Sequence, residues 1–182
     1  TEEQAKAITD WIVYTEKFTL FKSRKKIIYA KVTDQAGNLA IINSEGIVVY
    51  EDAQQVTEAI TYIKNVSGDL TADEKLNGNT VKSINDGTKN LAAETDYTVD
   101  AEGKITFKNT YLSPLAIKST PYTMTISYNP LGETYKSAKD NDAPADKTIA
   151  LTVRKPKLSE ITAPTAITGV ANGTVKDATA LG

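Results

Sequence analysis

The sequence contains no cysteine and no histidine among its 182 residues. The protein therefore cannot form a disulfide, a thiolate nucleophile, a Ser-His-Asp triad or a zinc site with the usual nitrogen and sulfur ligands. A strong net charge is also missing, since 21 basic residues stand against 23 acidic ones. We therefore expect no nucleic-acid partner. No apolar run approaches the roughly 20 residues of a membrane helix, so no membrane span is expected.

The chain does contain a strand pattern, in which apolar and polar residues alternate with a period of two. The alternation is clearest at residues 122–128 and 149–153. Such strands bury one face and leave the other to solvent. The residues that we expect to share the buried face are Tyr122, Met124, Ile126, Tyr128, Ile149, Leu151 and Val153.

Turn residues divide residues 54–155 into short strands. Asn77-Gly78 predicts a tight hairpin, and Asp86-Gly87 marks a further turn. Residues 97–99 and 104–107 are expected to form a hairpin with a longer loop at residues 100–103. One helical turn is expected at residues 109–115, where Pro114 stops it. Short strands at this spacing, with almost no helix, predict an all-β fold: an immunoglobulin-like Greek-key β-sandwich with two antiparallel layers.

The two ends of the chain are too short to form a sandwich each. Residues 1–53 are predicted to be a partial immunoglobulin-like repeat, with a short helix over residues 1–12 and about three strands. Residues 23–26 have the sequence Ser-Arg-Lys-Lys and are expected to form a solvated basic turn. Residues 156–182 are predicted to be a linker and the start of a further immunoglobulin-like domain. The chain is therefore interpreted as a segment of a modular protein.

An ordered set of turn and core residues in the middle of the chain carries a family resemblance. Its members are Leu76-Asn77-Gly78-Asn79, Ser83-Ile84, Asp86-Gly87, Leu91, Thr95-Asp96-Tyr97-Thr98-Val99, Gly103-Lys104-Ile105-Thr106-Phe107, Tyr111-Leu112 and Leu115. This set resembles the X2 module, an immunoglobulin-like domain of clostridial scaffoldins and secreted glycoside hydrolases. The sequence departs from that family at Glu94, where glycine is common, and in a longer connection at residues 129–147.

The flanking segments resemble other bacterial immunoglobulin-like repeats. Residues 28–48 are similar to the second half of a repeat found in Firmicutes surface proteins. Residues 163–174 are similar to the opening of a domain found in glycan-degrading enzymes. Three such pieces in tandem imply an extracellular or cell-surface protein of a Gram-positive bacterium, whose partners are neighbouring domains of the same polypeptide.

Exposed tyrosine rings are the first candidates for a binding site, because sugar-binding modules stack sugar rings on aromatic faces. Tyr62, Tyr111 and Tyr135 are the candidates, and Tyr135 lies in the long connection, where binding residues are often found. Core packing is the favoured alternative for a tyrosine in phase with aliphatic residues, as for Tyr97, Tyr122 and Tyr128. Trp11 is expected to plug the N-terminal piece.

Acidic residues supply the candidates for a metal or catalytic site. Asp140, Asp142 and Asp146 could offer oxygen ligands to calcium, although the spacing lacks the glycine and final glutamate of an EF-hand. A solvated loop is the favoured alternative. The pair Glu94 and Asp96 could suggest glycosidase chemistry, but a small sandwich usually presents a shallow surface. We expect no enzyme activity and no cofactor.

Three classes of function remain for this chain. The leading hypothesis is a non-catalytic structural spacer of an extracellular multidomain protein, monomeric and without a small-molecule pocket. The alternative is a carbohydrate- or cell-wall-binding accessory module of a glycan-degrading enzyme, which the X2 resemblance also allows. A third class, an adhesin for a host protein, would present a contiguous exposed apolar patch on one sheet face.

Overall fold

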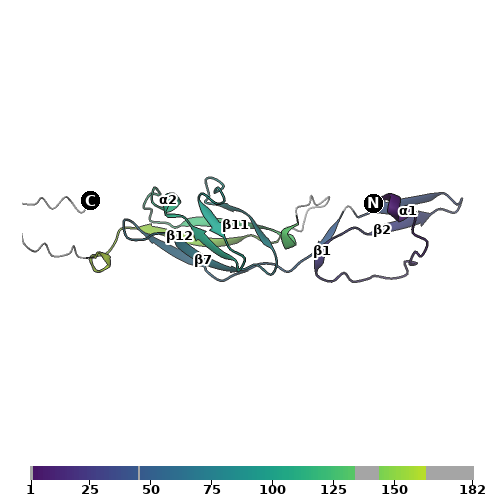
Figure 1. The fold of residues 1–182 in the computed structure, drawn as a ribbon, viewed down its shortest axis with the longest axis horizontal. Helices are drawn as coiled ribbons and strands as arrows, with labels where there is room; N and C mark the ends of the chain where they lie inside the picture. Colours follow the sequence, from purple (N-terminus) through teal and green to yellow (C-terminus); the bar gives the residue numbers. More distant parts are fainter. Residues whose placement is uncertain (1, 45, 134–143, 163–182) are drawn as a thin grey trace, which may run out of the picture.

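The computed structural model describes residues 2–44, 46–133 and 144–162. Figure 1 shows an elongated arrangement, in which a small β-rich piece at the N-terminal end is followed by a β-sandwich. We call residues 2–50 the N-terminal piece and residues 54–155 the sandwich. No helix of the described part is long and apolar enough to cross a membrane.

Two four-stranded sheets form the sandwich. The first has the order β5 (Gln54–Gln55), β7 (Leu70–Lys75), β10 (Lys104–Phe107) and β9 (Tyr97–Val99). The second has the order β6 (Ala59–Ile63), β12 (Lys147–Arg154), β11 (Tyr122–Asn129) and β8 (Thr80–Asn85). The all-β, immunoglobulin-like sandwich predicted from the sequence is confirmed.

One strand pair corrects the expectation of two purely antiparallel layers. Strand β6 pairs with β12 in parallel, whereas β11 pairs antiparallel with both β12 and β8. Parallel neighbours need a long crossover between them. Between β6 and β12 the chain forms β7, β9 and β10 of the opposite sheet and β8 and β11 of the same sheet. Strand β12 then lies beside β6 and runs in the same direction.

The core lies between the two sheets and consists of the inward-facing residues of alternating strands. Met124, Ile126, Ile149 and Leu151 are fully buried, and Tyr128 is 1% exposed. The alternation predicted for the last two strands is therefore confirmed. Burying each such side chain contributes about 1.5–3 kcal/mol to the free energy of folding.

Two predicted turns have different outcomes. The hairpin of β9 and β10 is present, with the turn closed by a hydrogen bond from Gly103 N to Asp100 O at 3.2 Å. The Asn77-Gly78 turn has the expected positive φ angles, 53° and 88°. It does not form a hairpin, because β7 and β8 belong to different sheets. Local turn chemistry determines the reversal of the chain, but not which sheet the next strand joins.

One short helix and two 3₁₀ turns border the sandwich. Helix α2 (Asn109–Leu112) covers one end of the core with the fully buried Leu112, as the single helical turn predicted there. The 3₁₀ turn η1 (Pro130–Gly132) follows β11. A second 3₁₀ turn, η2 (Leu158–Glu160), follows β12.

The N-terminal piece contains helix α1 (Glu2–Lys6) and two two-stranded sheets. Strand β2 (Tyr29–Thr33) pairs with β3 (Leu39–Asn43), and β1 (Ser23–Lys26) pairs with β4 (Ile47–Val49). Residues 23–26 were expected as a basic turn and are instead a strand. The main chain of residues 23–26 pairs with the apolar strand β4, and the basic side chains of these residues do not prevent that pairing.

The N-terminal helix is shorter than the twelve residues predicted. It ends at Lys6, and Ile12 is 95% exposed rather than on a buried helix face. The β-branched residues Ile8, Thr9, Ile12 and Val13 disfavour its continuation. Trp11 is half-buried and donates Nε1–H to Ile8 O at 2.9 Å, so it packs locally beside the helix end.

Candidate functional site

Two of the three candidate stacking tyrosines lie in the core of the sandwich. Tyr62 is 2% exposed, and its hydroxyl donates to Asn109 Oδ1 at 2.6 Å. Tyr111 is 5% exposed, and its hydroxyl donates to Asp86 Oδ2 at 3.1 Å. The expectation of exposed rings is therefore corrected at these two positions. Tyr135, the third candidate, lies outside the described residues.

The remaining tyrosines of the sandwich have covered rings too. Tyr97 and Tyr128 are buried core residues, as predicted. Tyr122 is half-buried; its hydroxyl donates to Ala116 O at 3.0 Å, and Lys118 Nζ lies 4.0 Å from its ring centroid. The lysine covers the ring face through a cation–π contact. Among the described residues of the sandwich, no aromatic side chain is exposed.

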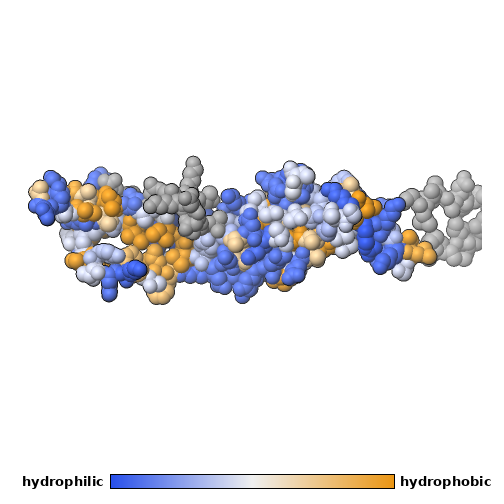
Figure 2. All heavy atoms as spheres, turned by 180° about the vertical axis from the view of Figure 1, so that it is seen from behind, coloured by the Kyte–Doolittle hydropathy of each residue, from blue (hydrophilic) through white to orange (hydrophobic). Residues whose placement is uncertain are grey.

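Exposed apolar and aromatic side chains gather on the N-terminal piece instead. Figure 2 shows patches of the hydrophobic colour at this end of the molecule, next to hydrophilic ones, whereas much of the visible sandwich surface is hydrophilic. The strongly exposed members are Ile12, Val13, Tyr14, Phe18 and Phe21, at 61–95%. Sequence analysis placed Ile12 on the buried face of a helix and assigned no structure to the other four residues, so it did not identify this group as a surface feature.

Two carboxylates are buried in the sandwich in different ways. Asp86, 7% exposed, accepts hydrogen bonds from Thr88 Oγ1 at 2.6 Å, Lys89 N at 2.9 Å and the Tyr111 hydroxyl. Burial raises its pKa, but these hydrogen bonds outweigh burial, and the pKa is lowered. Asp86 thus stays ionised while it fixes a turn and anchors Tyr111.

Glu74 is the other buried carboxylate and is 2% exposed. Its Oε2 accepts from the Tyr128 hydroxyl at 3.3 Å, and its Oε1 has no hydrogen-bond partner among the described residues. Burial raises the pKa of Glu74, while the Tyr128 hydrogen bond and the charge of Lys147 act in the opposite direction. Glu74 is thus a core carboxyl group with one side-chain hydrogen-bond partner among the described residues.

The acidic pair Glu94 and Asp96 serves the turn before β9. Glu94 is exposed and has a φ of 66°, in the left-handed region. Asp96 Oδ2 accepts from Ala92 N at 3.0 Å and from Lys89 Nζ at 3.4 Å. These contacts engage Asp96 in closing the turn.

The calcium candidates fall mostly beyond the part of the chain that the structure describes. Asp140 and Asp142 are not described, and Asp146 is exposed. Within residues 2–44, 46–133 and 144–162, no group of three carboxylate side chains could hold a metal ion.

The segment after β12 carries a contact that sequence analysis did not anticipate. The Arg154 guanidinium donates two parallel hydrogen bonds to Glu160, at 2.7 Å and 2.6 Å, and Lys157 N donates to Glu160 Oε2 at 2.8 Å. Hydrogen bonds from Arg154 and Lys157 lower the pKa of Glu160 to about 2. We call this set the exit clamp. Lys157 and Glu160 have the three-residue spacing of a capping box, whereas the pairing of Arg154 with Glu160 follows no helix or strand period.

Comparisons with known proteins assign the sandwich to a family. Residues 55–136 match the sequence model of the family described as carbohydrate binding domain X2. No curated protein matches the chain.

Among solved structures, the chain is similar to a tri-modular endo-β-1,4-glucanase from Bacillus licheniformis, with 22% identity and a TM-score of 0.43 over 57% of this chain. It is also similar to the tri-modular endo-β-1,4-glucanase B from Bacillus halodurans, with 18% identity and a TM-score of 0.44 over 57% of this chain. The matched region is 18% of each of those enzymes, so this chain spans less than a fifth of their length. Residues 55–136 are, by their family match, an X2 domain with an immunoglobulin-like sandwich fold.

Proposed function

We propose that this segment is a non-catalytic spacer that holds neighbouring parts of an extracellular multidomain protein apart. The observation that carries the proposal is that the chain enters and leaves the sandwich at opposite ends (Figure 1). Ala145 N donates to Asp52 Oδ1 at 3.1 Å, so the residues just before β12 lie beside the segment through which the chain arrives. From there β12 runs for 8 residues, which is about 26 Å of extended chain.

The exit clamp supports the same proposal. An arginine–carboxylate pair with two parallel hydrogen bonds restricts both distance and orientation. Pro156, between Arg154 and Glu160, restricts the backbone further. The chain therefore leaves the sandwich in a defined direction, which a spacer needs if it is to transmit an orientation.

A carbohydrate- or cell-wall-binding role is the second candidate, because the matched family is described as a carbohydrate binding domain. Such binding through stacking would need an exposed ring. Tyr135 in the long connection and Tyr14 on the N-terminal piece, 72% exposed, are the two positions that we would assign to it.

Retention on insoluble glycans separates the two functions. We expect the wild-type chain to remain in the supernatant when it is mixed with cellulose, xylan or peptidoglycan. Retention that is lost in Tyr135→Ala would establish the sandwich as a binding module, and loss in Tyr14→Ala would assign binding to the N-terminal piece. Retention of the wild type on any of the three would refute the spacer as its sole role.

We further propose that residues 1–53 are a partial immunoglobulin-like repeat, and residues 156–182 a linker with the start of another repeat. Two two-stranded sheets are marginal on their own, since independent stability generally takes three or more strands. The exposed apolar residues of the N-terminal piece support this proposal, because additional strands from a neighbouring domain would cover them. A monomeric state and an extracellular or cell-surface location on a Gram-positive bacterium complete the proposal.

A further inference from the structure

The segment between the N-terminal piece and the sandwich, residues 51–53, is held on the sandwich by asparagine side chains. Asn77 Nδ2 donates to Asp52 O at 2.6 Å, and Asn79 Nδ2 donates to Glu51 O at 2.7 Å. Ala53 is 1% exposed and belongs to the core cluster of the sandwich. Two consecutive carbonyl groups and one buried side chain therefore tie down a segment of only three residues.

Asn79 is the centre of these contacts. It is 2% exposed, its Oδ1 accepts from Leu131 N at 3.0 Å, and its own N–H donates to Leu76 O at 2.9 Å. The side-chain amide thus bridges the connecting segment to η1, while the backbone amide closes the turn between β7 and β8. Because both the Nδ2 and the Oδ1 of this buried side chain are hydrogen-bonded, the amide has a single orientation and fixes the positions of Glu51 and Leu131 relative to each other.

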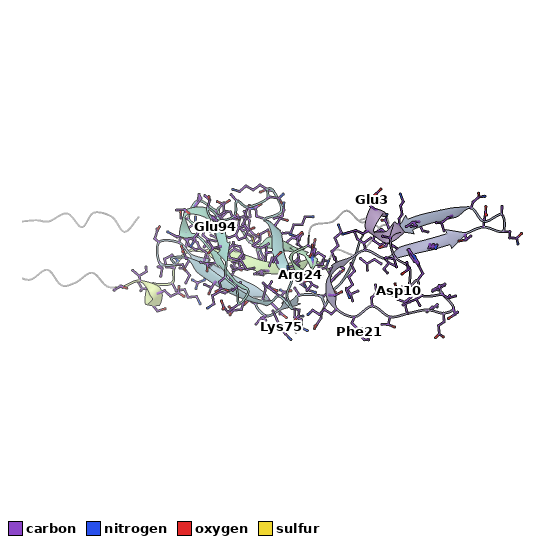
Figure 3. The ribbon with its side chains drawn as sticks, turned by 45° about the vertical axis from the view of Figure 1, so that its right-hand side comes forward. Glu3, Asp10, Phe21, Arg24, Lys75 and Glu94 are labelled. Atoms are coloured by element: carbon purple, nitrogen blue, oxygen red, sulfur yellow. The ribbon has the colours of Figure 1, made fainter. Side chains whose placement is uncertain are left out.

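The N-terminal piece reaches across the same place with a lysine. Lys22 Nζ donates to Asn77 O at 2.8 Å and lies 3.8 Å from Glu51 Oε2. In addition, β4 contacts η1. Figure 3 labels Arg24 of β1 and Lys75 of β7 on the two sides of this region, with the end of one unit facing the end of the other.

We infer that Lys22, Glu51, Asp52, Asn77 and Asn79 form a preformed joint, which fixes the angle between the N-terminal piece and the sandwich. This inference rests on the proposed spacer function and states how that function is achieved at the first of the two ends. A free three-residue linker samples many orientations, because each backbone residue keeps its rotational freedom. Here the carbonyl groups of two of the three residues are bound to the sandwich, and Lys22 of the N-terminal piece is bound to Asn77 beside them. Bending at the joint therefore requires the Lys22 contact and the contact between β4 and η1 to break.

The joint is chemically distinct from a metal-bridged junction. The Lys22 ammonium carries the positive charge that approaches Glu51 and a carbonyl oxygen, so the contact needs no bound cation. Because Lys22 and Glu51 have side chains 48% and 56% exposed, salt screens their attraction. The asparagine contacts are neutral and are expected to keep the joint closed at high salt.

Spin labels can measure the joint directly, because the sequence has no cysteine of its own. Thr33→Cys in β2 and Lys82→Cys in β8, both at exposed positions, place one label on each unit. We expect a narrow distance distribution by double electron–electron resonance in the otherwise wild-type chain. Asn79→Ala is expected to broaden it at least twofold, because the bridge to Glu51 O and to η1 is lost.

Two further variants keep the test decisive. Asn90→Ala is the matched control, since within the described part of the chain Asn90 Oδ1 accepts a hydrogen bond only from the nearby Asn85 side chain. The distance distribution of this variant should stay narrow. Lys22→Met removes the cross-piece contact at an exposed position and should broaden the distribution without lowering the melting temperature of the sandwich. If Asn79→Ala unfolds part of the sandwich, Lys22→Met still tests the joint in a folded protein.

A broad distribution in the wild type would overturn the joint, as would a narrow distribution in both Asn79→Ala and Lys22→Met. Neither result would bear on glycan retention, which tests the spacer function separately. A flexible wild type that is not retained on glycans would leave a spacer without a rigid joint.

Discussion

At the scale of single residues, the positive φ angle of Glu94 explains why the X2 family often has glycine at this position. Glycine is common in that family where this chain has Glu94, and Glu94 adopts a φ of 66°. The left-handed region costs a residue with a Cβ roughly 1–2 kcal/mol, whereas glycine enters it freely. The Glu94 backbone is kept there by the turn, in which Glu94 N donates to Tyr97 O at 2.7 Å.

Glu94→Gly is therefore expected to stabilise the sandwich by about 0.5–1 kcal/mol, after the larger chain entropy of glycine in the unfolded state is subtracted. Urea denaturation followed by circular dichroism measures the change. The control is Glu102→Gly, at an exposed turn position without a positive φ, which should not stabilise. Equal effects of the two substitutions would contradict the explanation.

Glu74 predicts a pH dependence of stability. Burial raises its folded-state pKa above the ordinary value of 4.5, so the protonated form is favoured in the fold. The contribution of Glu74 is fully present below the unfolded pKa and is lost as pH rises through the folded pKa. At neutral pH the wild type therefore carries the cost of a buried carboxylate, one oxygen of which has no hydrogen-bond partner among the residues that the structure describes.

Glu74→Gln is expected to raise the free energy of unfolding by about 1 kcal/mol at neutral pH, and to have a smaller effect near pH 4. Urea midpoints at several pH values test this, with the exposed Glu94→Gln as the control. A stabilisation that does not change with pH would argue against titration of Glu74.

At the scale of elements, strand β11 is an inner strand of its sheet, because it pairs with both β12 and β8. Its inward residues Met124 and Ile126 are fully buried, while Thr123 on the opposite face is exposed. Truncating a buried side chain removes its contacts and leaves a cavity.

Met124→Ala is expected to cost about 2–5 kcal/mol of unfolding free energy, against less than about 0.5 kcal/mol for Thr123→Ala. Thermal or urea denaturation of the two variants provides the comparison. A small loss for Met124→Ala would mean that the two sheets do not close on this residue.

At the scale of the whole molecule, both ends of the sandwich have hydrogen-bonded connections to the adjoining chain. The proposed joint lies at one end, and the exit clamp lies at the other. The Glu160 pKa of about 2 means that this carboxylate stays ionised, and the clamp intact, throughout the ordinary pH range. The contribution of a carboxylate with a lowered pKa is present above its unfolded pKa and is lost as pH falls through the folded one.

The exit clamp is therefore expected to open only between pH 4.5 and about 2. The amide proton of Lys157, which bonds Glu160 Oε2, should report this as a chemical-shift change with a midpoint near the lower value. In Glu160→Gln the change should disappear. A midpoint close to 4.5 would show that Glu160 is not engaged with Arg154 in solution.

Local patterns were sufficient for most strands of the sandwich. The period-two alternation identified the inward faces of β11 and β12, and the turn before β10 identified the β9–β10 hairpin. The same reasoning failed in the N-terminal piece, where β1 is basic and exposed and becomes a strand only through its partner β4. It also failed for Tyr62 and Tyr111, whose burial depends on side chains from distant strands.

Composition and periodicity thus determine that this chain is all-β, that it lacks thiol and imidazole chemistry, and which strand faces turn inward. These are local properties, since they depend on residue type and on neighbours a few positions away. Only the folded sandwich decides that Asn77-Gly78 turns a corner between sheets, that β6 pairs in parallel with β12, and that Asn79 meets Glu51. Those contacts join residues whose separation along the chain carries no periodic signal, so packing of the two sheets alone brings them together.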